Sequence, residues 1–377
     1  MIKVNDVLNI LNEYAPFIYQ EEYDNSGFQI GNRAHEVQKI LLCLDLTMDV
    51  VEEAIQHGFD LIISHHPLFF KAIQQIDISS AEGEIIQKLL ESKISVISVH
   101  TNFDNILKGT NKALASKLGL KDTKILRPKK DCLRKLVTFC PIDYSEKVRL
   151  ALFQAGGGYI GNYDSCSFNS DGYGTFRAQE GSHPFVGEIN QIHKESETRI
   201  EIIFPVHLTD VMIQSLLEVH PYEEVAYDII PLENSYASIG EGVIGNLPKK
   251  LAVIEFLEFV KSTLGCKYVR YNQLPDKMMI ERVAACGGSG SFLIQEAAKL
   301  NAEAFISADF KYHDFLNPLT KHLLIIDAGH YETEIGVLNL LKEFLLQKFP
   351  NFAVQITCKG VNPVNYLNGK ILLHLYL

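Results

Sequence analysis

The sequence predicts an α/β protein in which two related halves with mostly parallel sheets form one core, interrupted by a ferredoxin-like α+β segment. Three observations support this fold class. Strand-like and helix-like segments alternate with short links from residue 39, and the same alternation returns after residue 280. Between these two passages, residues 127–233 follow a different order. Strand–helix alternation is typical of parallel sheets, because two parallel strands need a crossover that usually forms a helix.

The first half of the predicted core spans residues 1–126 and begins with an amphipathic helix. Acidic and polar residues interrupt the apolar pattern of MIKVNDVLNILNEY, so we do not interpret it as a signal peptide. Short apolar runs then alternate with amphipathic segments, two of which have a glycine at or near their end. The expected strands are 39–47, 59–67 and 94–104, and the expected helices are 48–58, 82–93 and 111–120.

The second half spans residues 234–377 and repeats this rhythm. Residues 52–66 match residues 295–309 in pattern, and SVISVH matches LIIDAGH if one gap is allowed. Few residues are identical, and any two strand–helix–strand units share apolar spacing. We interpret the match as a weak internal repeat, which would bring two sets of strand ends toward one cleft. The expected strands are 281–286, 302–310 and 322–330, and the expected helices are 291–301 and 336–349.

The middle segment, residues 127–233, is predicted to be an inserted domain. Its strands and helices follow the order β-α-β-β-α-β, with a hairpin rich in Gly, Ser, Asn and Tyr at residues 159–182. That order is the ferredoxin-like plan. Pro128 and Pro231 lie near its two ends.

Composition excludes several classes of protein. The chain has 377 residues, of which 47% are hydrophobic and 21% charged, as in an ordinary globular protein. A net charge of −11 argues against a nucleic-acid-binding surface, which would be basic. No apolar run is long enough to span a membrane. Seven cysteines without a C-x-x-C pair indicate reduced thiols and a cytoplasmic location.

Histidines and carboxylates gather where the expected strands end. His65 and His66 follow LIIS, Asp104 follows the next strand, and His330 and Glu334 lie one helical turn apart after a later strand. Ligands bind at the carboxyl ends of strands in open α/β sheets. Imidazole and carboxylate ligands without thiolates suit Zn, Mn, Fe, Co or Ni. Five ligands exceed the need of one tetrahedral catalytic ion but suffice for two bridged divalent ions.

Each of these residues also has a structural alternative. Adjacent histidines such as His65 and His66 occur by chance in a chain with 13 histidines. An Asp after a strand, like Asp104, often caps a helix. A His–Glu pair at i and i+4, like His330 and Glu334, is common on solvated helix faces. The metal site is favoured because all five residues occupy equivalent strand ends in the two halves.

The chain resembles the NIF-three-like family, whose members are called GTP cyclohydrolase 1 type 2 homologues. The resemblance rests on four motifs and extends over the whole chain. It implies a dinuclear divalent-metal site held by His65, His66, Asp104, His330 and Glu334, with zinc foremost. It also implies a homohexamer with an internal cavity, and a CutA/PII-like insert carrying HPYEEVAYDII. The motifs are ISHHPLFF (63–70), VHTNFDN (99–105), GHYETE (329–334) and YDNSGFQIG (23–31).

Other residues near the strand ends are weaker candidates. His100 is expected to orient Asp104 or to transfer protons, with a core histidine as the alternative. Lys311 and His313 are expected to contact an anionic substrate or act as an acid, with a solvated loop as the alternative. Asp45 is expected to cap the helix that starts at Met48, or else to border the cleft. The GGSG loop (287–290) is expected to be a tight turn, with phosphate binding by its amides as the alternative.

Two functional hypotheses follow. The first is a metal-dependent hydrolase that uses metal-activated water on a nucleotide or another small phosphorylated or heterocyclic molecule. The second is a non-catalytic metal-binding protein that serves in metal storage, delivery or regulation through partners. A hydrolase needs an open coordination position and a nearby acid or base, whereas a carrier needs labile metal and no turnover. The sequence names neither the substrate nor the physiological metal.

Overall fold

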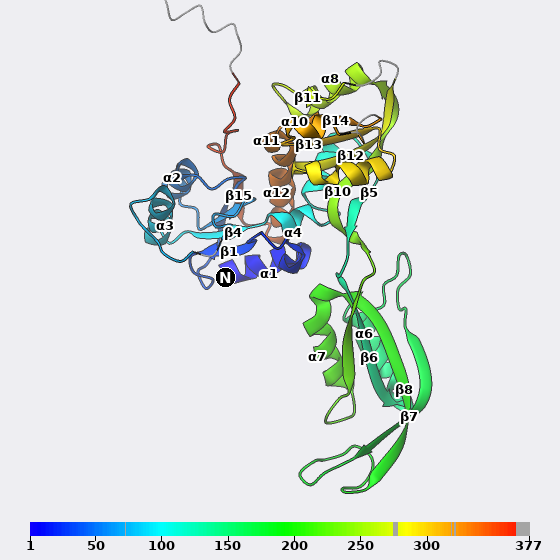
Figure 1. Cartoon of the computed structure of the whole chain (residues 1–377). Helices are drawn as coiled ribbons and strands as arrows, with labels where there is room; N and C mark the ends of the chain where they lie inside the picture. The colour runs from blue at the N-terminus through cyan, green and yellow to red at the C-terminus, as the bar shows by residue number, and fades with distance from the viewer. Residues whose placement is uncertain (72, 274–277, 318, 320–321, 367–377) are drawn as a thin grey trace, which may run out of the picture. The chain divides into compact units, whose positions relative to one another are not determined.

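The computed structural model of the chain describes residues 1–71, 73–273, 278–317, 319 and 322–366 (Figure 1). The chain divides into two compact units. One comprises Met1–Pro128 together with Ala237–Leu377, and the other comprises Lys129–Tyr236. A mixed α/β fold with several sheets results: two sheets belong to the first unit and one to the second. Within the described ranges, no helix combines the length and apolarity needed to cross a bilayer.

The first sheet of the larger unit has the strand order β1-β4-β3-β2-β15. Strands β2, β3, β4 and β15 are parallel, and β1 runs antiparallel to β4 at one edge. Alternate residues of β2, β3 and β4 pack against helices α2 and α3, because side chains of a strand point to opposite faces. The strands are β1 (Gly27–Ile30), β2 (Lys39–Cys43), β3 (Leu61–Ser64), β4 (Ser95–Ser98) and β15 (Ala353–Ile356), and the helices are α1 (Val4–Tyr14), α2 (Met48–His57) and α3 (Ala81–Glu91).

The second sheet of this unit has the order β11-β14-β13-β12-β10-β5. Strands β12, β13 and β14 are parallel, and β11 runs antiparallel to β14. Helices α5 and α8 cover one face of the sheet and α9 covers the other. The strands are β5 (Lys121–Lys129), β10 (Tyr236–Ala252), β11 (Arg270–Tyr271), β12 (Met279–Ser289), β13 (Ala304–Ala308) and β14 (Leu324–Asp327), and the helices are α5 (Thr110–Lys117), α8 (Val253–Leu264) and α9 (Ile294–Lys299).

The two sheets repeat one arrangement. In each, three consecutive parallel strands (β2, β3, β4 or β12, β13, β14) lie in the order of the chain, with a short antiparallel strand at the edge next to the third. The central strands β3 and β13 are buried at every residue. Charged side chains and histidines follow these strands and do not lie within them. Short helices follow three of the parallel strands: α4 (Thr101–Asp104) follows β4, α10 (Tyr312–Phe315) follows β13, and α11 (His330–Glu334) follows β14. The longer helix α12 (Gly336–Lys348) comes directly after α11.

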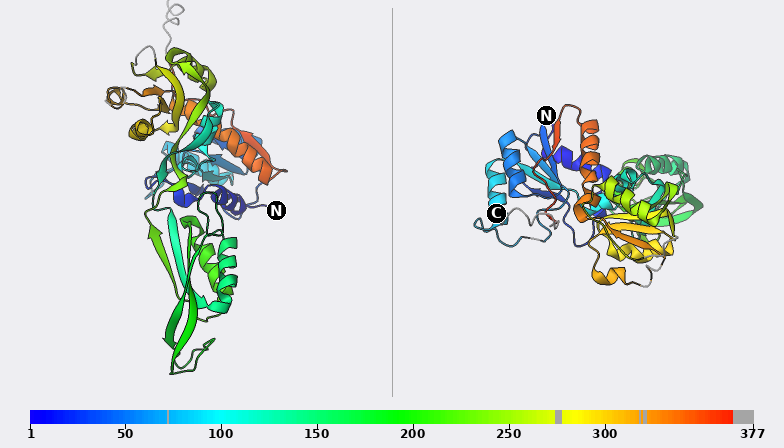
Figure 2. Two further views of the ribbon diagram at one scale, coloured as in Figure 1. Left: turned by 90° about the vertical axis from the view of Figure 1, so that its right-hand side faces the viewer. Right: turned by 90° about the horizontal axis from the view of Figure 1, so that it is seen from above.

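The smaller unit is one four-stranded antiparallel sheet with two helices on one face (Figures 1 and 2). Its strand order is β7-β8-β6-β9, and the elements follow the chain order β-α-β-β-α-β. Buried apolar residues of β6 and β8 pack against α6 and α7. The elements are β6 (Leu133–Pro141), α6 (Ser145–Gln154), β7 (Phe168–Arg177), β8 (Ile192–Pro205), α7 (Thr209–Val219) and β9 (Tyr227–Leu232).

The buried ring of His220 fixes the corner between α7 and β9. Its Nε2 lies 2.9 Å from the carbonyl oxygen of Phe139, and its Nδ1 accepts the backbone N–H of Tyr222 at 3.2 Å. The ring is neutral with the proton on Nε2, because only that tautomer makes both hydrogen bonds. Burial of the ring lowers the pKa of His220. This histidine of the HPYEE motif therefore has a structural role in the corner.

We predict that this corner loses stability as the pH falls. The unfolded chain takes up a proton at His220 near pH 6.5 and below, whereas the folded corner resists protonation. Protonation therefore favours the unfolded state. This loss of folding stability is absent at higher pH and grows as the pH falls through 6.5. The measurement is hydrogen exchange of peptides from α7 and β9 between about pH 8 and pH 5 in wild type and His220→Gln. The stability advantage of wild type should shrink on acidification. A constant advantage would contradict the account.

Candidate metal centre

Four imidazole rings and two carboxylates from the two halves of the larger unit meet at one place. His65 and His66 follow β3, and Asp104 ends α4 after β4. His330 and Glu334 lie on α11 after β14, so both sheets contribute. Oε2 of Glu334 lies 3.1 Å from Nε2 of His66, 3.1 Å from Nε2 of His330 and 3.9 Å from Nε2 of His65. The structure thus brings together the five residues that the sequence singles out as ligands.

The rings of His65 and His66 are each held at Nδ1. In His65, Nδ1 lies 2.7 Å from the carbonyl oxygen of Val99, so Nδ1 donates and Nε2 carries a lone pair. In His66, Nδ1 lies 2.8 Å from Oδ1 of Asp45. The residue before α2 is Thr47, so Asp45 orients a histidine instead of capping that helix. Burial disfavours the charged form of His66, but its hydrogen bonds to Asp45 and Glu334 outweigh this and raise its pKa to about 10.

The rings of His100 and His330 are held in the same manner. Nδ1 of His100 lies 2.8 Å from Oδ1 of Asp24, and Nδ1 of His330 lies 2.7 Å from Oδ2 of Asp309. Hydrogen bonding to Glu334 and Asp309 raises the pKa of His330 to about 9 in spite of burial. All four rings therefore keep Nε2 as the nitrogen left for the site. Outer carboxylates of this kind are typical partners of metal-binding histidines.

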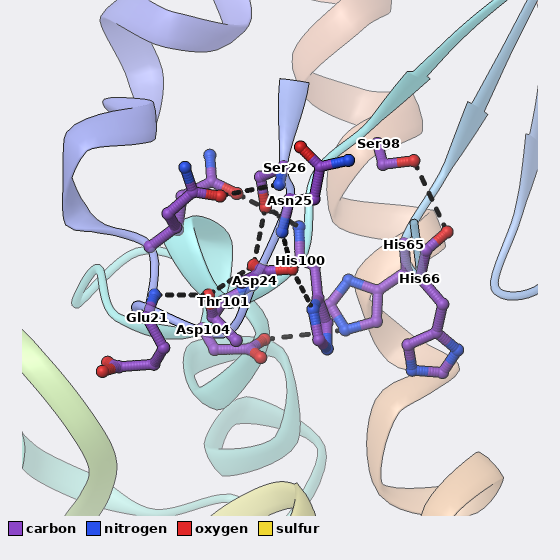
Figure 3. Close-up of polar contacts among 12 residues, drawn as sticks. Glu21, Asp24, Asn25, Ser26, His65, His66, Ser98, His100, Thr101 and Asp104 are labelled. Carbon is purple, nitrogen blue, oxygen red and sulfur yellow. Dashed lines mark hydrogen bonds and ion pairs between the residues drawn. The ribbon is translucent and has the colours of Figure 1, made fainter. Parts of the chain in front are cut away.

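Asp24 is buried behind His100 and is fixed from several sides (Figure 3). Its carboxylate accepts hydrogen bonds from the backbone N–H and the hydroxyl of Thr101 and from the hydroxyl of Ser26. Burial works against the charge, but the contact with His100 and these donors hold the pKa of Asp24 well below its usual range. Asp24 precedes His100 by 76 residues, and no spacing in the sequence signals the contact.

The site holds two buried atoms that have no hydrogen-bond partner among the described residues. They are Nε2 of His65 and Oδ1 of Asp104, which lie 3.6 Å apart. Burial lowers the pKa of His65 to about 3 and raises that of the Asp104 carboxyl to about 7. A neutral imidazole and a carboxylate facing each other across such a gap are the donor set of a divalent metal, which relieves the cost of burying both unpaired. The residues therefore fit an ion.

Two groups of side chains have ligand atoms within 4.8 Å of one another: His65 with His66 and His100, and His66 with His330 and Glu334. His66 belongs to both groups. His100, which was expected to act on Asp104 or on protons, thus lies as close to His65 and His66 as a ligand would.

The helix α5, which follows Asp104, has Gly109 at its N-cap, so Asp104 is not the cap of that helix. Its carboxylate is free to serve the site.

The GGSG segment is not the tight turn expected from the sequence, because Gly287 to Ser289 belong to the bulged end of strand β12. This end packs against the site and does not offer its first two amides to a ligand. The N–H of Gly287 donates to Oδ1 of Asn111 at 2.9 Å, and that of Gly288 donates to the hydroxyl of Thr333 at 3.0 Å. Gly288 has φ +61°, and a Cβ there would lie 2.2 Å from Oε1 of Glu334. The glycine is needed because the carboxylate of Glu334 approaches the backbone closely.

A cavity of about 590 Å³ opens over the site. His66, His100, Asp104, His330 and Glu334 are all among its lining residues. Lys311 and His313 do not line it. Lys311 precedes α10 and is exposed, and its backbone N–H donates to Asp314. A role for Lys311 or His313 in catalysis stays a prediction.

We predict that Gly288→Ala disrupts the site beyond its effect on the backbone. Any alanine at a positive φ costs on the order of 1–2 kcal/mol. At Gly288 the methyl group must also displace the buried carboxylate of Glu334. Gly119→Ala is the matched control, because Gly119 has φ +69° but nothing within 4 Å of its Cβ position.

Thermal unfolding and bound zinc should be measured for both variants. Both should unfold at lower temperature than wild type, and Gly288→Ala alone should lose zinc. Equal zinc content in the two variants would contradict the close approach of Glu334 to Gly288.

Comparisons with known proteins agree with this fold. A family model described as Duf34/NIF3 (NGG1p interacting factor 3) matches residues 2–363. The GTP cyclohydrolase 1 type 2 homolog of Bacillus subtilis (strain 168) is 34% identical over 365 residues, which is 96% of this chain and 98% of that protein. The protein of the same name from Listeria innocua is 36% identical over 324 residues, 85% of this chain and 86% of its own.

Solved structures are similar over nearly the whole chain. The crystal structure of a Bacillus cereus protein related to NIF3 has a TM-score of 0.82 and 35% identity, and the match covers 97% of this chain and 99% of that one. Reduced HcgD from Methanocaldococcus jannaschii, with a TM-score of 0.55 and 20% identity, shows the fold alone and covers 94% of this chain and 97% of its own. The family model and the relatives together show that this chain belongs to the Duf34/NIF3 family.

Proposed function

We propose that this chain is a metal-dependent hydrolase with two divalent ions in the site described above. The observation that carries the proposal is the buried, unpartnered pair of Nε2 of His65 and Oδ1 of Asp104, 3.6 Å apart, beside a second group of potential ligands formed by His66, His330 and Glu334. His65, His66, Asp104, His330 and Glu334 would hold the ions. The donor set is nitrogen and oxygen without thiolate, which suits zinc first and also Mn, Fe, Co or Ni.

The metal supplies Lewis acidity, which makes water a competent nucleophile near neutral pH. The chain itself supplies orientation and proton transfer. Asp24 holds Nδ1 of His100, so Nε2 of that ring is free to take a proton from water or to return it to a leaving group. Asp45 and Asp309 keep the rings of His66 and His330 facing the same point.

The relatives' name supports a heterocyclic or nucleotide substrate. A cyclohydrolase opens a ring by adding water to a carbon of the heterocycle, and a site with Lewis acid and a nearby base suits that reaction. The cavity of about 590 Å³ is of the size that small-molecule sites have.

The same proposal extends to assembly and to the smaller unit. Its β-α-β-β-α-β order supports a ferredoxin-like domain of the CutA/PII-like kind inserted into a core formed by residues 1–126 and 234–377. Together with the family resemblance, this supports a cytoplasmic homohexamer in which the insert serves assembly or access to the site. The oligomer mass measured in the experiment below tests the hexamer.

The test is elemental analysis of untagged protein, with the oligomer mass measured in each sample. We expect about two ions per chain in wild type and their loss in His65→Ala and Glu334→Ala. His57→Ala is the control, because His57 is exposed at the end of α2, away from the proposed ligands.

Retention of the ions in assembled His65→Ala and Glu334→Ala would contradict the ligand assignment. A wild type that stays metal-free after incubation with zinc and manganese would remove the proposal. Metal that binds and exchanges freely without any turnover would favour a metal carrier instead of a hydrolase.

A further inference from the structure

We propose that the substrate of this site carries no phosphate and is a neutral or cationic nitrogen heterocycle. This inference rests on the proposed hydrolase function and narrows its substrate class. The argument comes from the charges, the backbone amides and the aromatic side chains that line the cavity over the metal centre.

The cavity lining is strongly acidic. Six of its residues carry carboxylates, and none of the described lining residues is lysine or arginine. Sites that bind di- and triphosphates normally offer arginine or lysine to the phosphate oxygens. The six carboxylates exceed the positive charge of two divalent ions, and Arg127 balances one of them, so a loaded site keeps about one net negative charge and offers a polyanion no attraction beyond the ions themselves. The carboxylates are those of Glu21, Asp45, Glu82, Asp104, Glu241 and Glu334.

Arg127, which contacts two of the lining residues, is already engaged. Nε of Arg127 donates to Oε2 of Glu241 at 2.5 Å, and its guanidinium lies 4.9 Å from the ring centroid of Phe292. Arg127 neutralises the carboxylate of Glu241 and stacks on the ring of Phe292. Arg127 therefore reduces the local negative charge, but its paired N–H donors face Glu241 and are not offered to a phosphate.

Backbone amides do not replace the missing cations. A glycine-rich loop can bind phosphate when successive N–H groups point at it. Here Gly287 and Gly288 direct their N–H groups to Asn111 and Thr333. These two amides are therefore not available to a phosphate.

Aromatic residues give the cavity an apolar side. Tyr23, Phe70 and Phe292 line it, and each is about half or more exposed, at 66%, 49% and 49%. The ring of Phe70 lies 5.8 Å from that of His100, edge to face. Exposed aromatic rings beside a metal centre suit stacking with a planar ring. The acceptor-rich carboxylates suit ring N–H and amino groups, which are donors.

Matched nucleosides and nucleotides test the proposal on the zinc-loaded, full-length protein. Guanosine, adenosine and cytidine are each compared with their 5′-triphosphates by calorimetry at low salt, and zinc content is checked after each titration. We expect at least one nucleoside to bind and its triphosphate to bind about tenfold more weakly or not at all. A triphosphate or inorganic tripolyphosphate that binds more tightly than every nucleoside would overturn the proposal. Failure of all three nucleosides to bind would overturn it too.

A charge reversal makes the test specific to the cavity. Glu82 lines the cavity on helix α3, whereas Glu84 on the same helix does not. Glu82→Lys should raise triphosphate affinity about tenfold, because the reversal removes a negative charge and adds a positive one beside the ligand. Glu84→Lys, with the same net change, should have a smaller effect. Equal effects would show that overall charge decides binding, not the cavity lining.

The outcomes separate this inference from the hydrolase proposal. A nucleoside that binds but is never hydrolysed would remove the enzymatic function and leave only the preference of the cavity for ligands without phosphate. Hydrolysis of a triphosphate in preference to its nucleoside would keep the enzymatic function and overturn the inference.

Discussion

The site depends on one constraint, which is that four histidines have their Nδ1 atoms fixed by an oxygen. A backbone carbonyl holds His65, and three carboxylates hold His66, His100 and His330. Each contact selects Nε2 as the nitrogen that faces the site, because Nδ1 is already used. In His66 and His330, whose pKa values are raised, an ion would take the place of the proton on Nε2. The ligand geometry is therefore built before any ion arrives, and little ordering entropy remains to oppose binding.

The fold explains why these residues meet. Strands β3 and β13 are buried at every position, and they hold apolar side chains and serines but no charged residue or histidine. Imidazoles and carboxylates appear directly after such strands, and two sheets of the same arrangement supply them from both halves of the core. Gly288 completes the site by letting Glu334 approach the backbone where any side chain would collide with it. The N–H of Gly288 donates to the hydroxyl of Thr333, so this end of β12 supports the site structurally.

The sequence predicts which strands carry the ligands, but it extends them too far: residues 101–104 of the expected strand 94–104 form helix α4, and β3 ends at Ser64 instead of residue 67. It predicts the outer partners poorly. His65 and His66 stand out because an apolar run stops at them, and His330 with Glu334 stands out by helical spacing. Asp24 gives no such signal, since its role depends on a loop folding across 76 residues to reach His100. Asp45 looks like a helix cap from sequence, but its carboxylate reaches His66 instead. Strands β1, β5, β11 and β15 were not anticipated, because short or edge strands have no long apolar run. Strand β10 lies inside its sheet, but glycines and Pro248 interrupt its apolar pattern.

Anomalous diffraction from zinc-loaded crystals, recorded on both sides of the zinc edge, tests the central claim most directly. The account predicts two zinc peaks about 3.5–4 Å apart, with Nε2 of His65, His66 and His330 as ligands and every Nδ1 still bonded to its oxygen. A single peak with His66 outside the coordination sphere, or ligation through Nδ1 after loss of the carboxylate contacts, would contradict it.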